Sequence, residues 1–218
     1  MVDLQLMHHL ESYLTERRKE RFLEVLSQRT KHFTVAIEDV YQLHNTSAVI
    51  RSCDVFGVQE LQVIEEQNSK RIDREIAMGA QKWVDVNRYE TAQLCIDTLR
   101  SQGYRIVATS PHKDDCDLED FNIDEPACFF FGRETIGLSD TILEQADQYL
   151  KIPMHGFTES LNVSVSAAII LQRLTFRLKQ SDLPWQLSDE EQYHKRIDWC
   201  KKTIKSIDSV LNRYYDSQ

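Results

Sequence analysis

Six short apolar runs constrain the fold of this chain more than any other feature. They are rich in β-branched and aromatic residues and lie at residues 32–37, 61–64, 83–86, 105–109, 127–131 and 150–154. Helical patterns separate most of them, notably at residues 91–102 and 139–149. Strands that alternate with helices form a mainly parallel sheet, because each crossover lays a helix on one face of that sheet. The sequence therefore predicts an α/β fold with helices on both faces.

Helical segments flank this α/β body at both ends of the chain. Residues 15–28 have the pattern of an amphipathic helix. Near the other end, Ser188 is followed three residues later by Glu191, which is a capping box. The helix that begins there carries one apolar stripe from residue 193 to residue 214. Because Pro184 interrupts the pattern between the α/β body and the C-terminal helix, we expect three parts: a helical extension at 1–31, an α/β body at 32–180 and a second helical extension at 181–218.

Length and composition bound the class of protein. With 218 residues and 41% apolar residues, the chain can bury a substantial core. No apolar run approaches the roughly 18 residues of a membrane span, and the first residues lack a signal-peptide core. We therefore expect a cytoplasmic protein that does not bind membranes. The five cysteines form no C-x-x-C pair and the seven histidines share no ligand spacing, so neither a disulfide framework nor a metal site is expected.

The formal net charge of −9 is unevenly distributed. Basic and acidic residues nearly balance in the first 31 and the last 31 residues, so the acidity belongs to the middle of the chain. The basic side chains of the two end segments that could follow an RNA backbone are Arg17, Arg18, Lys19, Arg21, Lys195, Lys202 and Lys205. They form either solvated helix faces or a phosphate-binding surface. In the second case, the affinity for RNA should fall steeply with salt.

Two glycine-containing loops follow predicted strands. Gly132 and Gly137 come after the strand at 127–131, and Gly156 comes after the strand at 150–154. Open α/β sheets bind ligands at the carboxyl ends of their strands, so two such loops favour a binding pocket over simple turns. Neither loop has the spacing of a dinucleotide-binding or P-loop fingerprint, and the chain has no H-E-x-x-H or G-x-S-x-G motif.

Polar residues gather at the start of a predicted helix at residues 160–179. Its first residues, together with the one before them, read E-S-L-N-V-S-V-S-A-A-I-I-L. A helix N-terminus carries free N–H groups, so Ser160 and Asn162 either cap the helix or face a ligand. The apolar residues that we expect to dock this helix on the sheet are Val163, Val165, Ile169 and Ile170.

Another helix is predicted from about residue 45 to Gly57. Asn45 suits its N-cap. Arg51 lies inside it among small and apolar residues, and it either pairs with Asp54 or binds an anion.

Taken together, three motifs resemble the TrmH (SpoU) family of ribose 2′-O-methyltransferases, within the SPOUT superfamily of RNA methyltransferases. The family motif N-x-x-A-x-x-R matches residues 45–51, F-G-x-E-x-x-G-L-S matches residues 131–139, and I-P-M-x-G-x-x-x-S-L-N-V-S matches residues 152–164. The three motifs occur in the family's order.

The resemblance implies a trefoil knot in the C-terminal part of the sheet, bound S-adenosylmethionine, and a homodimer in which each active site is completed by the partner. The donor would be bordered by Thr109, Gly132, Ile152, Met154, Gly156 and Leu161. The catalytic residues would be Asn45, Arg51, Glu134, Ser160 and Asn162.

The implied reaction is methyl transfer to the ribose 2′-hydroxyl of a guanosine. The stretch G-A-Q-K-W-V at residues 79–84 and the basic terminal helices look like the branch that modifies guanosine 18 in the D-loop of tRNA. The family account makes Arg51 the general base, but a guanidinium with a pKa above about 12 rarely gives up its proton. We expect Arg51 to position and polarise the hydroxyl and its phosphate, with the base left open.

Three alternatives to this function remain. The substrate could be a ribosomal RNA guanosine or another tRNA position, such as the wobble ribose. The chain could also be a non-catalytic RNA-binding member of the superfamily. The least favoured alternative is a small-molecule enzyme that uses another nucleotide.

Overall fold

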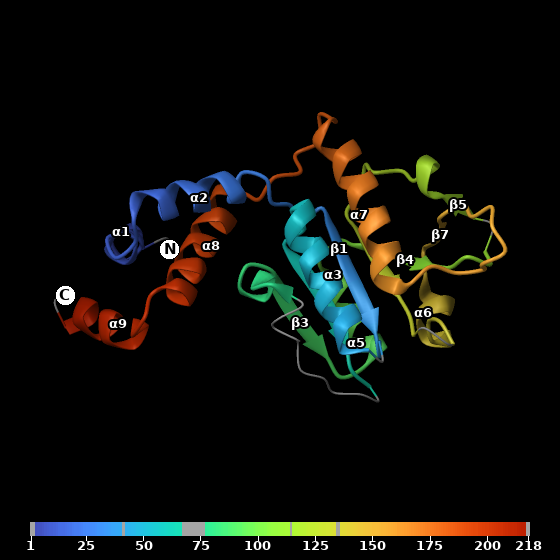
Figure 1. Cartoon of the computed structure of the whole chain (residues 1–218), viewed down its shortest axis with the longest axis horizontal. Helices are drawn as coiled ribbons and strands as arrows, with labels where there is room; N and C mark the ends of the chain where they lie inside the picture. Colours follow the sequence, from blue (N-terminus) through green and yellow to red (C-terminus); the bar gives the residue numbers. More distant parts are fainter. Residues whose placement is uncertain (1–2, 41, 67–76, 114, 134–135, 217–218) are drawn as a thin grey trace. The chain divides into compact units, whose positions relative to one another are not determined.

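The computed structural model describes residues 3–40, 42–66, 77–113, 115–133 and 136–216 (Figure 1). The chain divides into two compact units, which are described separately here. The sheet unit comprises Thr30–Trp185, and the terminal unit comprises Met1–Arg29 with Gln186–Gln218. The two end segments that the sequence suggests as separate extensions therefore share one unit.

The described residues of the sheet unit contain seven strands. They are β1 (Phe33–Glu38), β2 (Glu60–Ile64), β3 (Asp85–Tyr89), β4 (Arg105–Thr109), β5 (Cys116–Asp117), β6 (Ala127–Phe131) and β7 (Gln148–Lys151). Their order is β3-β2-β1-β6-β4-β7-β5, and each neighbouring pair is parallel. The predicted parallel α/β sheet is confirmed.

Helices cover both faces of the sheet, as predicted. On one face, α3 (Leu43–Phe56) and α7 (Val163–Lys179) pack on side chains such as Val35 and Ile37 of β1 (Figure 1). On the other face, α5 (Ala92–Ser101) and α6 (Asp140–Gln145) pack on Ala36 and its neighbours. Successive residues of a strand point to opposite faces, so one apolar strand supplies both cores. Two short 3-10 helices, η1 (Ala80–Lys82) and η2 (Leu118–Asp120), lie in the connections.

Several predicted boundaries in this unit are wrong. The helix predicted at 139–149 ends at Gln145 because Asp147 hydrogen-bonds to Ile106 through both its backbone and its carboxylate, which draws the chain into the sheet. The helix predicted to start at Ser160 begins at Val163. Val165 and Ile169 are 45% and 37% exposed and do not dock it on the sheet. Its buried face instead carries Val163, Ala167, Ile170, Leu171, Leu174, Thr175 and Leu178.

The terminal unit contains four helices within its described residues. They are α1 (Leu4–Glu11), α2 (Glu16–Leu26), α8 (Asp189–Thr203) and α9 (Ile207–Asp216). Its core centres on Trp199, which is 1% exposed and meets Phe22 edge to face. The capping box of Ser188 and Glu191 is confirmed. One continuous helix to residue 214 is wrong, since Ile204 is extended and Ser206 has a φ of 56°.

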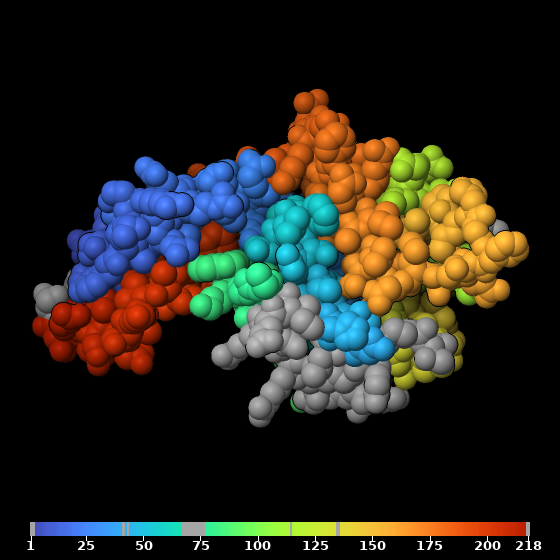
Figure 2. Space-filling model, in the orientation of Figure 1, coloured from blue at the N-terminus to red at the C-terminus, as the bar shows by residue number. Residues whose placement is uncertain are grey.

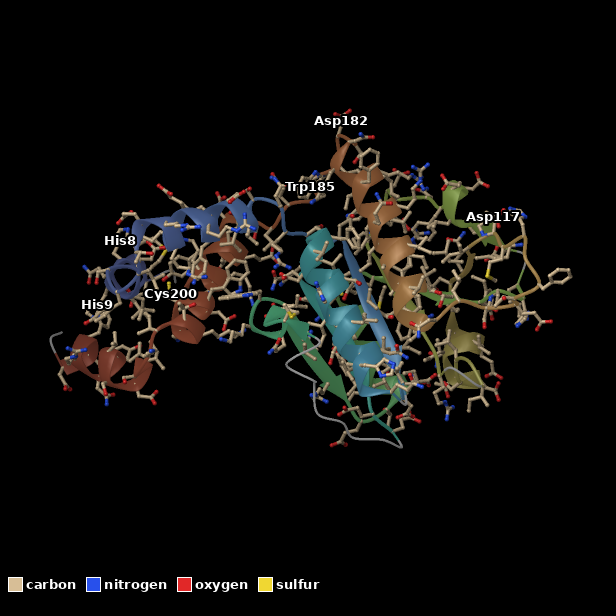
Figure 3. The ribbon with its side chains drawn as sticks, viewed as in Figure 1. His8, His9, Asp117, Asp182, Trp185 and Cys200 are labelled. Carbon is tan, nitrogen blue, oxygen red and sulfur yellow. The ribbon has the colours of Figure 1, made fainter. Side chains whose placement is uncertain are left out.

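The cysteines are mostly buried, as expected of small apolar residues. Cys53, Cys95, Cys128 and Cys200 are buried and Cys116 is half-buried. Figure 3 shows Cys200 on α8 of the terminal unit, where burial raises the pKa of its thiol to about 11. Across the described ranges, no helix has the length and apolar character needed to span a bilayer.

Candidate functional site

The sheet brings three predicted donor-binding residues to one edge. β6, β4 and β7 are neighbours in the sheet, and their carboxyl ends are in register, since Ala108 pairs with Phe130 and Thr109 with Leu150. Thr109 closes β4, Gly132 follows β6 and Ile152 follows β7. The Thr109 hydroxyl donates to the Phe130 carbonyl at 2.7 Å, which ties the ends of two of these strands together. This is the edge at which parallel sheets bind ligands.

Backbone hydrogen bonds join two described residues of the loop after β6. The N–H of Arg133 donates to the carbonyl of Gly137 at 3.0 Å, and the N–H of Gly137 donates back at 2.9 Å. Gly137 has a φ of 73°, which side-chain-bearing residues rarely adopt. A Cβ on Gly132 would lie 2.2 Å from the backbone carbon of Gly137, so both glycines are required by the loop itself. Glu134, predicted to be catalytic, lies outside the described residues.

Asn162 makes hydrogen bonds to both α7 and α3, the two helices that carry residues of the predicted site. It is the N-cap of α7, where its Oδ1 accepts from the N–H of Ser164 at 2.8 Å and from the Ser164 hydroxyl at 2.6 Å. Its Nδ2 donates to Oδ1 of Asn45 at 3.2 Å. Asn162 therefore caps the helix and binds a second motif residue at the same time. Figure 2 shows α3 and α7 side by side at the surface.

Asn45 is not an N-cap. It lies inside α3, whose N-cap is Gln42, and it is 1% exposed. The capping interpretation of Asn45 is therefore wrong, and its side chain instead accepts the hydrogen bond from Asn162.

The loop before α7 is open. Ser160 and Leu161 are exposed, Met154 and Ile152 are half-buried, and Gly156 is exposed. A Cβ on Gly156 would meet only Thr158 N, at 3.9 Å, so the fold itself does not require glycine there.

Arg51 is exposed on α3. No hydrogen bond or ion pair joins it to Asp54 or to any other residue that the structure describes. It lies six residues after Asn45, which is about 9 Å along the helix axis and on a different side of the helix. The structure thus pairs Asn45 with Asn162 and leaves Arg51 on the outer surface of α3.

The predicted RNA-contacting side chains belong to the terminal unit. On α2, Arg17 and Arg18 are exposed, while Lys19 pairs with Glu16 and Arg21 with Glu24, each at 2.7 Å. In the C-terminal segment, Lys205 is exposed, Lys202 pairs with Asp198 at 2.7 Å, and Lys195 has a side chain that is only 16% exposed. These intrahelical pairs on a solvated surface contribute little stability, so they do not fix the charges in place.

One buried carboxylate beside this site escapes the sequence analysis. Glu38, the last residue of β1, is 1% exposed, and its Oε2 accepts from the N–H of Ser139 at 2.8 Å. Burial raises the pKa of its carboxyl, opposed by the Ser139 hydrogen bond and the charge of Arg133. The sequence feature that could have pointed to Glu38 is an acidic residue at the end of an apolar strand. Among the described residues, no group of three or more potential metal ligands is assembled.

Comparison with known proteins places this geometry in a class. The model of the SpoU rRNA Methylase family matches residues 32–172. The chain belongs to this family and is a methyltransferase of the SpoU type.

Individual relatives extend the likeness to most of the chain. A tRNA (guanosine(18)-2′-O)-methyltransferase of Borreliella burgdorferi is 36% identical over 203 residues, which cover 93% of this chain and 93% of that protein. A Thermus thermophilus protein of the same name is 35% identical, covering 86% of this chain and 98% of its own. The crystal structure of the A. aeolicus TrmH/SpoU tRNA modifying enzyme matches with a TM-score of 0.78 and 32% identity over 87% of this chain and 98% of that one.

Replacing Gly132 should disrupt the loop after β6. In Gly132→Ala, the new Cβ meets backbone atoms that cannot rotate away, so we expect a loss of about 1–3 kcal/mol in the free energy of unfolding. Denaturant titration measures this loss. Gly156→Ala is the matched control and should leave the unfolding midpoint unchanged, because its Cβ meets nothing closer than 3.9 Å. Equal stability of the two variants would contradict the packing argument.

Two substitutions at Asn162 separate its cap from its link to Asn45. Asn162→Ser keeps a good N-cap and should retain the thermal midpoint of unfolding. Asn162→Ala should lower the free energy of unfolding by about 1 kcal/mol. Both variants lack the side-chain amide N–H that binds Asn45 Oδ1, so both should lower the rate of methyl transfer about 100-fold. The measurements are thermal unfolding and transfer of labelled methyl groups. Full activity of Asn162→Ser would leave Asn162 with a capping role alone.

Proposed function

We propose that the protein transfers a methyl group from S-adenosylmethionine to the ribose 2′-hydroxyl of guanosine 18 in tRNA. The observation that carries this proposal is the likeness to proteins of that name at 35–36% identity over 86–93% of this chain. Asn45 of the motif at 45–51 and Asn162 of the motif at 152–164 meet in the sheet unit, which supports this proposal.

The residues present fit an adenosyl group. Leu161 is 39% exposed and Ile152 and Met154 are half-buried, so apolar side chains stay accessible beside the backbone of the Gly132 loop and the segment around Gly156. Together with Thr109, these residues would hold the donor. When bound, S-adenosylmethionine supplies an electrophilic methyl group on a sulfonium centre. The protein's part is to align the acceptor oxygen with that carbon at about 3 to 3.5 Å.

The polar groups near the start of α7 would orient the acceptor ribose. Ser160 is exposed and free to turn toward a ligand, and the bond from Asn162 to Asn45 fixes the amide of Asn162 beside it. Arg51 offers a planar fork of donors for a phosphate and for the hydroxyl of the same nucleotide. Glu134 completes the proposed catalytic set by its place in the motif. We keep the identity of the general base open.

We further propose a homodimer through the outer surface of α3 and α7. Four exposed apolar side chains lie there: Val55, Val165, Ile169 and Phe176. Such a patch on a soluble protein marks an interaction site. Arg51 shares the outer surface of α3, so a partner subunit docked there would receive this guanidinium at its own site. A trefoil knot in the C-terminal part of the sheet and a cytoplasmic location belong to the same proposal.

The terminal unit would contact the tRNA outside the site. Arg17 and Arg18 are exposed on α2, and Lys205 is exposed between α8 and α9. Such side chains neutralise phosphates without reading sequence, and their contribution is salt-dependent. In this proposal, the parts at 1–31 and 181–218 bind RNA while the part at 32–180 performs the chemistry.

A transfer assay tests the substrate. The protein, labelled S-adenosylmethionine and unmodified tRNA should give label at guanosine 18 alone, and Arg51→Lys should lower the rate at least tenfold because lysine lacks the planar fork. Nuclease mapping locates the label. Ribosomal RNA is the second arm, since the family description names rRNA. Label in ribosomal RNA or at another tRNA position would replace the proposed target, and no transfer to either RNA would contradict the proposal.

Charge placed on the α7 surface should dissociate the dimer. Val165→Glu puts a carboxylate into the proposed interface, and its burial would be costly, so we expect a monomer with little methyl transfer and an unchanged circular dichroism spectrum. Leu94→Glu is the control, because Leu94 is 52% exposed on α5 at the opposite face of the sheet. Sedimentation velocity measures the mass. A dimeric, active Val165→Glu variant would rule out this interface.

A further inference from the structure

Glu38 is an acidic side chain buried where the fold does not need one. It ends β1, which lies between β2 and β6 inside the sheet, and it is 1% exposed. Glutamate is almost never fully buried unless it is paired or hydrogen-bonded, because removing a carboxylate from water is costly. The position of its hydrogen-bond partner shows what the carboxylate holds.

The partner is the backbone of the loop after β6. Oε2 of Glu38 accepts from the N–H of Ser139 at 2.8 Å, and Ser139 is both the end of that loop and the N-cap of α6. The other fixed point of the loop is the pair of hydrogen bonds between Arg133 and Gly137. Leu138, between these two points, is buried in the core under α6. The loop is therefore anchored at its end by a side chain from a different strand.

Glu38 lies seven residues before Asn45, the first residue of the motif at residues 45–51. After Glu38, Asp39 turns the chain with a φ of 45°, and its N–H donates to Ile64 at 3.0 Å. Val40 is buried, and α3 then begins at Leu43 and carries Asn45. Glu38 thus connects the end of the loop after β6 to β1, the strand that precedes α3 and its Asn45.

We propose that Glu38 is a positioning residue, which fixes residues 136–139, the described C-terminal part of the loop after β6, against the end of β1 and so sets the affinity for the methyl donor. It contacts neither the donor nor the ribose, and it acts through the backbone of Ser139. The inference rests on the proposed function, because it assigns that loop to the donor site.

Steady-state kinetics with S-adenosylmethionine as the varied substrate test this role. Glu38→Ala removes the side chain that binds the Ser139 amide, so we expect the KM for S-adenosylmethionine to rise about tenfold with kcat within about threefold of the wild type. Glu38→Gln keeps an acceptor oxygen and should restore the KM to within about threefold. Ser139→Pro removes the N–H that makes the same hydrogen bond, because proline has no backbone N–H. The φ of −66° at Ser139 already suits proline, so this variant should reproduce the rise in KM.

Glu66→Ala is the matched control. Glu66 also follows a parallel strand, and its carboxylate accepts from the N–H of Ala92 at 2.7 Å at the start of α5. The Glu66→Ala variant loses a hydrogen bond of the same kind outside the loop, so its KM for S-adenosylmethionine should equal that of the wild type. The proposal is overturned if Glu38→Ala shows the same KM as Glu66→Ala, or if only its thermal midpoint and kcat fall.

Hydrogen exchange of the Ser139 amide keeps this test separate from the proposed reaction. In Glu38→Ala this amide should exchange at least tenfold faster, while the amide of Ala92 keeps its wild-type rate. If the wild-type protein transferred no methyl group to RNA, the proposed function would fail, and equilibrium binding of S-adenosylmethionine to the same variants would still decide the role of Glu38. Unchanged exchange and unchanged donor affinity in Glu38→Ala would end the proposal.

Discussion

The hydrogen bond between Asn162 and Asn45 is the interaction on which the site depends. A single amide group serves two ends: its oxygen caps α7 through Ser164, and its nitrogen donates to a residue buried in α3. An N-cap fixes the direction in which the chain enters a helix. The open segment before α7, which contains Ser160 and Leu161, therefore leaves the fold in a direction set by α3. The cap of α7 and the link to α3 are two hydrogen bonds of one side chain, made by its oxygen and by its nitrogen.

The strand order explains why distant motifs meet at this point. β1 and β6 are neighbours although more than 80 residues separate them, and β4 and β7 follow on the same side. All these strands are parallel, so the residues after each of them emerge at one edge. Thr109, Gly132 and Ile152 lie at the ends of three different strands and gather there, because the sheet and not the sequence spacing sets their separation.

The sequence was informative where local physics decides the outcome. Strand β6 is a continuous apolar run, and the helix ending at Gly57 and the capping box at Ser188 follow from local residue preferences, so all three were predictable. The boundaries that failed depend on tertiary contacts. Asp147 ends α6 early through hydrogen bonds to β4, and Val165 and Ile169 share the spacing of core residues but lie on the exposed side of α7. The motifs indicated which residues belong to the site, while only the structure shows that Asn45 and Asn162 touch.

The exposed stripe on α7 and the position of Arg51 both bear on the homodimer proposed above. A helix that buries seven residues on one side and still presents Val165, Ile169 and Phe176 on the other has two apolar faces, and a soluble monomer needs only one. Arg51 lies six residues after Asn45, about 9 Å further along α3 and on a different side of that helix. Two copies packed on this surface would bury the second apolar face. They would also bring each Arg51 to the site from which its own helix directs it away.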